Sequence, residues 1–356
     1  MSESNGTVLV IGGGPAGLRA AQSIADVGTK VVLVEKRHEL GGMPIAANYA
    51  VLTPYGEPAE PVMRRIAGGV ENHPLVELRL SSELTAFEGT PGAFRATVRG
   101  PAGEDVVEAG ACVVATGFQH FDPGRETQMY GYYEFPDVLA LQDLEAMLKV
   151  GNVVRPSNGE PPERICFVQC VGSRDRQIGN EYCSKVCCGV ASKEAIELRQ
   201  LLPDSKVYIF YIDMRMYGYW ESQIYWPAQE KHHVQYVKGI ITEVLPKGDK
   251  LLVRGEDTTM GRPMELLMDM VVLSVGMEPS IGTREVAKLL EIQQNKYGFI
   301  EGIASPLDPV TTSREGIFAC GAALGPADLE DSVSSGANAA MKAVATVRAH
   351  SMTTAG

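Results

Sequence analysis

The stretch that decides the fold is TVLVIGGGPAG, residues 7–17. The apolar, β-branched run 7–11 is typical of a buried parallel strand, and a glycine-rich turn follows it at once. Gly12, Gly14 and Gly17 fit the pattern G-x-G-x-x-G. The first glycine permits a tight turn, the second lets the backbone approach a pyrophosphate, and the third lets the following helix pack on the strand. The stretch therefore predicts a dinucleotide-binding strand–turn–helix unit.

The next residues continue this unit. Residues 18–28 predict a helix that ends at Gly28, and 30–35 predict a second strand that ends at Glu35. An acid at the end of this strand can bind the ribose hydroxyls of a dinucleotide. The pyrophosphate is expected at the helix N-terminus, where free N–H groups and the helix dipole favour anions. The candidate binding residues of this region are Gly12, Gly14, Pro15, Ala16, Gly17, Glu35, Lys36, Gly42 and Met43.

Two later stretches favour FAD as the dinucleotide. CVVATGF (112–118) predicts a strand and resembles the second FAD signature of flavoproteins with two dinucleotide-binding domains, and 311–333 resembles the third. In most proteins of that class an acid follows the glycine at the end of the last strand, whereas this chain has Ala322. A side chain at 331 or 332 is expected to cap the last helix. The candidate FAD residues here are Ala115, Thr116, Gly117, Gly321, Ala322, Asp331 and Ser332.

A second strand–helix–strand pattern lies between these signatures. It runs from the apolar stretch 163–170 through a predicted helix at 191–202 to the apolar stretch 268–276. We therefore expect an α/β, thioredoxin-reductase-like flavoprotein fold with two dinucleotide-binding domains. The FAD-binding Rossmann domain, 1–150 and 281–356, would be interrupted by a Rossmann-like module at 151–280.

The inserted module lacks the glycine fingerprint that binds NAD(P)H in ordinary proteins of this fold. QCVGSRDRQIGNEYCSKVCCGV (169–190) stands in its place, so we expect ordinary NAD(P)H binding to be compromised. Arg174 and Asp175 either hold this loop with an ion pair or face water.

Four cysteines of this loop admit several chemistries. Their spacing is C-x₁₂-C-x₃-C-C, unlike the two short pairs of most structural zinc sites. Residues 40–48 contain no cysteine, although many pyridine-nucleotide disulfide reductases place their reactive pair there. Soft thiolates bind iron–sulfur clusters, and a cluster beside a flavin can accept one at a time the electrons that FAD takes up in pairs. Buried thiols, structural zinc and a redox disulfide stay open beside the favoured iron–sulfur cluster. If 183–188 is helical, Cys183 and Cys187 share one face.

The cysteine block resembles the flavoprotein A subunit of heterodisulfide reductases. The stretches QMYGYYEFPDV (128–138), IDMRMYGYWE (212–221), VVLSVGMEP (271–279) and the ending 321–340 resemble it too. The resemblance implies FAD, a homodimer, and a cytoplasmic complex with heterodisulfide-reductase-like subunits of the B and C types. It implies a [4Fe–4S] cluster held by Cys170, Cys183, Cys187 and Cys188.

Lys193 follows the cysteine block and is our candidate catalytic residue, because a cation there could stabilise negative charge on a reduced flavin. The chain contains no C-x₂-C-x₂-C run and resembles the short A-like subunit of sulfur-oxidising bacteria. That likeness implies oxidation of sulfane sulfur, with a lipoate-binding protein as the sulfur carrier. The alternatives are a stand-alone NAD(P)H-dependent disulfide oxidoreductase and a non-catalytic assembly subunit.

Composition excludes several classes of partner. The formal charge of −12 argues against nucleic acid, whose phosphates need a basic face. No apolar run reaches about 18 residues, so no membrane span is expected. The N-terminus does not resemble a signal peptide, and we expect a reducing cytoplasmic location. Cys112, Cys166 and Cys320 are expected to be packing residues.

Overall fold

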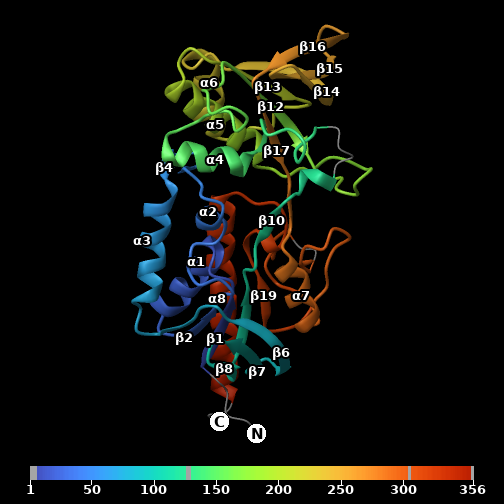
Figure 1. The fold of residues 1–356 in the computed structure, drawn as a ribbon. Helices are drawn as coiled ribbons and strands as arrows, with labels where there is room; N and C mark the ends of the chain where they lie inside the picture. The colour runs from blue at the N-terminus through green and yellow to red at the C-terminus, as the bar shows by residue number, and fades with distance from the viewer. Residues whose placement is uncertain (1–5, 126–129, 304–305, 354–356) are drawn as a thin grey trace. The chain divides into compact units, whose positions relative to one another are not determined.

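A computed structural model describes residues 6–125, 130–303 and 306–353 (Figure 1). Contacts divide the chain into unit 1, residues 1–46, 61–119 and 278–356, and unit 2, residues 47–60 and 120–277. The main division therefore falls after residue 119, earlier than the boundary at 150 that the sequence suggests. The physical reason is β11 (Val138–Ala140), which pairs with β17 (Met270–Val275) in the sheet of unit 2.

Unit 1 is built on a parallel sheet of five strands with the order β19-β9-β1-β2-β5. The chain runs outward from β1 in one direction to β2 and β5, and in the other to β9 and β19. Such a reversal creates a crevice at the carboxyl ends of the two central strands, where ligands bind in folds of this kind. The strands are β1 (Thr7–Ile11), β2 (Lys30–Val34), β5 (Val76–Arg79), β9 (Ala111–Val114) and β19 (Ile317–Ala319).

Helices α1 (Pro15–Asp26) and α8 (Leu329–Thr353) pack closely together in unit 1 (Figure 1). A Cβ on Gly336 would lie 2.4 Å from the carbonyl oxygen of Ala16, so the close approach requires glycine. An antiparallel sheet of β6 (Glu83–Thr90), β7 (Ala93–Gly100) and β8 (Gly103–Ala109) completes the unit together with α7 (Ile281–Leu289). The short elements α2 (Met43–Ala46) and η3 (Gly321–Ala323) also belong to unit 1.

Three elements span a boundary of the division: α3 (Ala59–Glu71), β10 (Phe118–His120) and β18 (Met277–Pro279).

Unit 2 contains a sheet of seven strands with the order β11-β17-β12-β13-β14-β15-β16. The strands from β11 to β14 are parallel, and β15 and β16 extend the sheet as an antiparallel hairpin. This arrangement confirms the second Rossmann-like module. The further strands are β12 (Arg164–Val171), β13 (Lys206–Tyr211), β14 (Gln235–Lys247), β15 (Lys250–Asp257), β16 (Arg262–Met268), β3 (Val51–Leu52) and β4 (Glu57–Pro58).

Helices α4 (Leu141–Val150) and α5 (Cys187–Leu201) pack side by side on this sheet (Figure 1). Helix α5 begins at Cys187, earlier than the expected start at 191. The other helical elements of unit 2 are η1 (Pro123–Arg125), the π-helix η2 (Glu221–Tyr225) and α6 (Trp226–Glu230).

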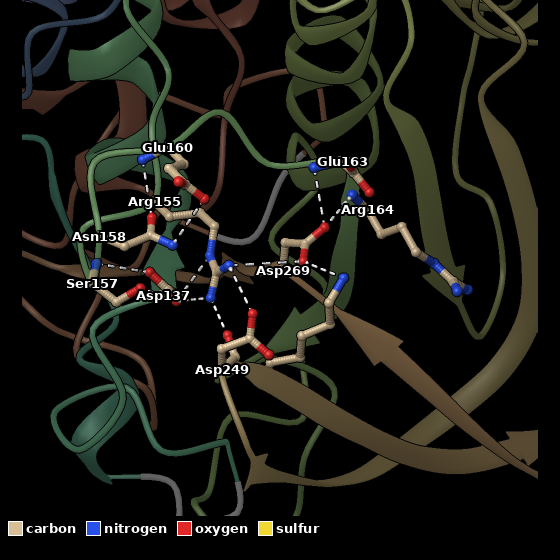
Figure 2. A network of polar contacts seen from close by, with 10 residues as sticks. Asp137, Arg155, Ser157, Asn158, Glu160, Glu163, Arg164, Asp249 and Asp269 are labelled. Atoms are coloured by element: carbon tan, nitrogen blue, oxygen red, sulfur yellow. Dashed lines mark hydrogen bonds and ion pairs between the residues drawn. The ribbon is translucent and has the colours of Figure 1, made fainter.

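A buried ionic network lies at the amino ends of the strands of unit 2 (Figure 2). Arg155 is 5% exposed and donates from Nη2 to Oδ2 of Asp137 at 3.0 Å. Its Nη1 lies 3.9 Å from Oδ1 of Asp269. Asp269 also accepts hydrogen bonds from the backbone N of Arg164, at 2.8 Å, and of Glu163, at 3.0 Å. The network therefore joins the starts of β11, β12 and β17, at the edge opposite the ligand edge of a parallel sheet.

Replacing Arg155 with methionine is expected to destabilise unit 2 by about 3–5 kcal/mol, because the buried carboxylate of Asp137 loses its cation, whereas Asp269 keeps Lys250 at 2.9 Å. Denaturant unfolding followed by circular dichroism measures this change. The control is Arg254→Met, which removes an exposed cation that pairs with Glu243 and Glu265 and should leave the unfolding midpoint nearly unchanged. Equal midpoints for the two variants would contradict the assignment.

Candidate functional site

The glycine-rich turn after β1 has the geometry that a dinucleotide requires. Gly12 has φ +106°, and a Cβ there would lie 2.3 Å from the carbonyl oxygen of Ala115. A Cβ on Gly17 would lie 1.8 Å from the carbonyl oxygen of Gly12, so neither position accepts a side chain. Gly14 differs, because its Cβ would meet only Cα of Gly42, at 3.6 Å. Gly14 therefore faces open space at the N-terminus of α1, where a pyrophosphate can approach the backbone.

Glu35 lies directly after β2 and is buried. Its carboxylate accepts hydrogen bonds from the backbone N of Gly13, at 2.6 Å, and of Arg37, at 2.8 Å. These two bonds hold the acid beside the glycine-rich turn, where a ribose-binding carboxylate is expected.

The other candidates of this region surround the same turn. The backbone N of Gly41 donates to the carbonyl oxygen of Gly13 at 2.9 Å, which brings the loop after Glu35 against the turn. Pro15, Gly42 and Met43 are half-buried, Ala16 is buried and Lys36 is exposed.

The second expected FAD segment follows β9. Its residues Ala115, Thr116 and Gly117 lead out of the strand toward the N-terminus of α7. The hydroxyl oxygens of Thr116 and Thr283 are 2.7 Å apart, and Ser280 donates to the carbonyl oxygen of Thr116 at 3.1 Å. The side chain and the carbonyl oxygen of Thr116 are therefore both engaged within the protein.

The third expected FAD segment follows β19. Gly321 has φ +65°, a conformation that favours glycine, and its backbone N donates to Oγ of Ser335 at 2.9 Å. Ala322 is buried directly after it. All three segments of unit 1 thus emerge at the carboxyl ends of parallel strands.

The expected cap of α8 is wrong. Asp331 and Ser332 lie inside the first turn of the helix, which begins at Leu329. The cap is Asp328, whose Oδ1 accepts a hydrogen bond from the backbone N of Asp331 at 2.7 Å. An aspartate directly before the helical pattern was the available signal, since Asp is a preferred N-cap residue.

The four candidate cysteines lie at the carboxyl edge of the sheet of unit 2. Cys170 is near the end of β12, Cys187 and Cys188 open α5, and Cys183 lies in the loop between them. Residues 183–186 are not helical, and Lys185 has φ +65°, so Cys183 and Cys187 do not share a helix face. Cys170 also has a positive φ, +66°. Left-handed backbone at non-glycine residues is costly and collects at functional sites.

The loop 172–186 covers the carboxyl ends of β12 and β17. Ser184 accepts a hydrogen bond from the backbone N of Met277 at 3.1 Å, and Tyr182 donates to the carbonyl oxygen of Met277 at 2.8 Å. A Cβ on Gly276 would lie 2.9 Å from the carbonyl oxygen of Gly172. The loop thus packs where a second dinucleotide would bind in a fold of this kind.

Three of the sulfur atoms interact with one another. The thiol of Cys187 is hydrogen-bonded to both Cys170 and Cys188. The bond from Cys187 lowers the pKa of Cys170 to about 7, against burial that would raise it, and the guanidinium of Arg174 contributes. The same hydrogen bonds raise the pKa of Cys187. Sγ of Cys183 accepts a hydrogen bond from the backbone N of Lys185 at 3.3 Å.

The donor chemistry of this loop fits a soft metal centre. Thiolates are favoured by the N-terminus of α5, whose first residues carry free N–H groups, and by the nearby guanidinium. Within residues 6–125, 130–303 and 306–353, however, no group of three or more His, Cys, Asp or Glu side chains is already arranged to hold a metal ion.

Of the two residues expected to hold the cysteine loop with an ion pair, Arg174 forms one and Asp175 does not take part in it. Nη2 of Arg174 donates to Asp213 at 2.6 Å, because the loop lies against the end of β13. Asp175 instead accepts a hydrogen bond from the backbone N of Gln177 at 2.7 Å. Asp213 is 39 positions from Arg174, so the sequence alone did not indicate it as the partner.

Lys193 is buried in the second turn of α5. Its Nζ donates to Oε1 of Glu145 on α4, and it lies 3.3 Å from Oε2 of Glu197. The sequence reasoning missed these acids and the neighbouring Glu194. Charged residues inside a helix that packs on another helix were the available signal. The packing cysteines are as expected, since Cys112, Cys166 and Cys320 are fully buried.

Comparison with known proteins identifies the family. Residues 6–345 match the family model of pyridine nucleotide-disulphide oxidoreductases. The solved thioredoxin reductase of T. acidophilum matches 95% of this chain, with 97% of its own chain covered, a TM-score of 0.63 and 18% identity. That of Lactococcus lactis matches 96%, with 99% of its own chain covered, a TM-score of 0.64 and 19% identity. These structures confirm the thioredoxin-reductase-like fold.

The curated relatives are components of larger enzymes. The chain is 30% identical to the iron-sulfur A subunit of the CoB–CoM heterodisulfide reductase of Methanocaldococcus jannaschii, over 95% of this chain and 64% of the relative. It is 37% identical to the A subunit of the H2:CoB-CoM heterodisulfide,ferredoxin reductase of Methanothermobacter marburgensis, over 67% of this chain and 37% of the relative. The chain thus spans less than two thirds of these relatives.

In the described residues, no helix combines the length and the apolar character that crossing a membrane demands. The match over nearly the whole chain, the shared fold and the relatives agree with the resemblance that the cysteine block indicates. The chain belongs to the pyridine nucleotide-disulphide oxidoreductase family, and it is an oxidoreductase whose curated relatives are A subunits of heterodisulfide reductases.

Proposed function

We propose that this chain is the FAD- and iron–sulfur-dependent electron-transfer subunit of a heterodisulfide-reductase-like complex. The observation that carries the proposal is the cysteine loop. It packs over the carboxyl ends of β12 and β17, where relatives of this fold bind NAD(P)H, and it brings the thiol of Cys187 within hydrogen-bonding reach of Cys170 and Cys188. A redox centre thereby replaces a nicotinamide site.

FAD would be held by the residues of unit 1 described above. The backbone at Gly14 and the N-terminus of α1 would bind the pyrophosphate. Glu35 would accept hydrogen bonds from the ribose hydroxyls, and the segments at 115–117 and 321–322 would line the remaining site. The open space in front of Gly14 supports this assignment.

The cluster would be held by Cys170, Cys183, Cys187 and Cys188. When bound, a flavin and a cluster let one protein exchange electrons in pairs and singly. Cys187 lies beside Cys170 and Cys188, which supports these three as ligands of one centre. Cys183 lies in irregular backbone and would have to turn its Sγ away from the backbone N of Lys185.

The partners follow from the relatives and from the resemblance. B- and C-type subunits of a heterodisulfide-reductase-like complex would exchange electrons with this chain, which would act as a homodimer in the cytoplasm. The thiol, disulfide or sulfane-sulfur substrate would be bound by a partner, with a lipoate-binding protein as carrier in sulfur oxidation.

The first test is the content of iron and acid-labile sulfide per bound FAD in the full chain, purified without oxygen. About four of each per FAD are expected for a [4Fe–4S] cluster. Iron near zero after anaerobic reconstitution, together with thiols that form a disulfide, would contradict the proposal.

A second candidate is a stand-alone NAD(P)H-dependent disulfide oxidoreductase. It is favoured by the hydrogen-bonded thiols and by the pKa of Cys170, lowered to about 7 by the bond from Cys187, since a thiolate is the reactive form of cysteine. Rapid reduction of the flavin by NADH would support this candidate. Because the loop 172–186 covers the place where NAD(P)H binds in relatives of this fold, we expect slow reduction of the flavin by NADH instead.

Lys193 is proposed to stabilise negative charge on the reduced flavin. Lys193→Gln removes that charge while keeping a polar side chain, so the flavin potential is expected to fall with FAD still bound. A loss of about 1.4 kcal/mol corresponds to about 30 mV for a two-electron couple. Spectroscopic redox titration measures the shift, with Lys149→Gln on α4 as the control. An unchanged potential in Lys193→Gln would retire this role.

A further inference from the structure

A cluster of buried charges joins α4 and α5 in unit 2. Glu194 is fully buried, Glu145 is 3% exposed and Lys193 is 6% exposed. Lys193 is hydrogen-bonded to Glu145 and lies 3.3 Å from Glu197. Glu145 also accepts a hydrogen bond from the backbone N of Ala50 at 2.8 Å. The cluster thus sets three carboxyl groups against one ammonium group.

Glu194 differs from its neighbours in having no donor. Among the described residues, no hydrogen-bond donor reaches either oxygen of its carboxyl group. Its carboxyl group faces that of Glu145 closely enough for the two to share a hydrogen bond once one of them holds a proton. An isolated carboxylate in such a place is very costly, and a buried acid avoids that cost by remaining protonated.

The surrounding charges act in the same direction. Burial and the carboxylates of Glu145 and Glu197 raise the pKa of Glu194 well above its usual range, and the charge of Lys193 opposes them only in part. Tyr49, on the segment before β3, also faces Glu145 and Glu194. One proton would reduce the net charge of the four-residue cluster from −2 to −1.

We propose that the Glu145–Lys193–Glu194–Glu197 cluster is a buried proton-binding site in which Glu194 holds the proton, and that it exchanges this proton when the charge of the cysteine site changes. The second part rests on the proposed function. When the cysteine centre loses an electron, Glu194 releases its proton to water. When a one-electron donor reduces the centre again, Glu194 takes one proton back from water.

The connection to the cysteines is through α5. Glu194 follows Cys187 by seven residues, which in an α-helix is two turns on the same face and a rise of about 10 Å. Both residues are buried, so water screens their charges weakly. Tyr49 lies near Glu145 and Glu194, and its hydroxyl is 3.1 Å from Nε2 of His120, so these two side chains are the candidates for carrying the proton.

The proton itself is tested by infrared spectroscopy of the full chain, kept reduced, at neutral pH. The carbonyl stretch of a protonated carboxylic acid is expected in the unmodified protein and is expected to be absent from Glu194→Gln, a neutral side chain of the same shape. The matched control is Glu197→Gln on the same helix, whose side chain is 18% exposed and whose loss should leave the band. Absence of the band, or its loss only in Glu197→Gln, would overturn the assignment.

Stability against pH is an independent readout. A carboxyl group whose folded pKa is raised is protonated in the folded state and ionised in the unfolded state, so stability falls as pH rises above the unfolded value. The folding equilibrium constant should fall about tenfold per pH unit for this proton. Glu194→Gln should lose that slope. An identical slope in the variant would contradict the proposal.

Coupling to the cysteines is tested on protein that carries its cluster. The midpoint potential of the cluster should fall with rising pH, and the slope should flatten in Glu194→Gln. If the infrared band is present but the cluster potential does not change with pH, the proton site is supported and the coupling is overturned. Absence of iron would reject the proposed function instead, while the infrared and stability results would still decide the proton site.

Discussion

Cys187→Ser is expected to reduce the iron and acid-labile sulfide of the chain from about four of each per FAD to near zero. Cys187 is the central sulfur of the three that interact, with hydrogen bonds to Cys170 and to Cys188. A serine oxygen is a harder ligand than a thiolate and suits iron–sulfur binding poorly. Chemical analysis of iron and sulfide measures the result, and the visible spectrum reports FAD in the same sample.

The matched control is Cys166→Ser. Cys166 is a fully buried cysteine on β12, the strand that also carries Cys170. This variant makes the same sulfur-to-oxygen change within a strand rather than at the carboxyl edge of the sheet, so it is expected to keep iron at the level of the unmodified chain. Loss of iron in Cys166→Ser, with iron retained in Cys187→Ser, would show that the metal binds elsewhere than in the cysteine loop. Loss in both variants with intact FAD would indicate a general defect of unit 2.

Gly14→Leu is expected to weaken FAD binding by about 100-fold or more, equivalent to about 2.8 kcal/mol. The backbone of Gly14 is extended, with φ −79° and ψ −177°, so a larger residue fits without backbone strain. Its Cβ would meet only Cα of Gly42 at 3.6 Å, so the added side chain points into the space proposed for the pyrophosphate. Titration of the FAD-free protein with FAD, followed by flavin fluorescence, measures the change.

Two comparisons make this result specific. Gly68→Ala, on α3, places a Cβ where nothing lies within 4 Å, and it should leave FAD binding unchanged. Gly17→Ala would put a Cβ 1.8 Å from the carbonyl oxygen of Gly12, so it should disturb folding as well as binding. Unchanged FAD affinity in Gly14→Leu, with a normal circular dichroism spectrum, would place the cofactor elsewhere.

The glycine-rich turn shows what the sequence determines by itself. The roles of Gly12 and Gly17 follow from local backbone geometry, and the apolar runs around them report burial in a parallel sheet. The same local rules place Glu35 after β2 and Cys170 near the end of β12. The resemblance carried by the cysteine block also identified the relatives correctly, since it depends on residue spacing alone.

Features that depend on distant side chains were not predictable in the same way. Glu145 and Lys193 are 48 positions apart, and only the packing of α4 on α5 makes them partners. Arg174 pairs with Asp213, 39 positions away, because the cysteine loop lies against the end of β13. The earlier boundary of unit 2 has the same origin, since β11 joins its sheet.

The sequence by itself therefore determined the fold class, the dinucleotide-binding turn and the cysteines that gather at one sheet edge. Each of these follows from patterns of neighbouring residues. Only the tertiary structure decided that the cysteine loop covers the carboxyl ends of β12 and β17, and that Glu194 is buried without a hydrogen-bond donor among the described residues. Burial and the partners of a polar group depend on which remote segments pack together, and no local pattern encodes that packing.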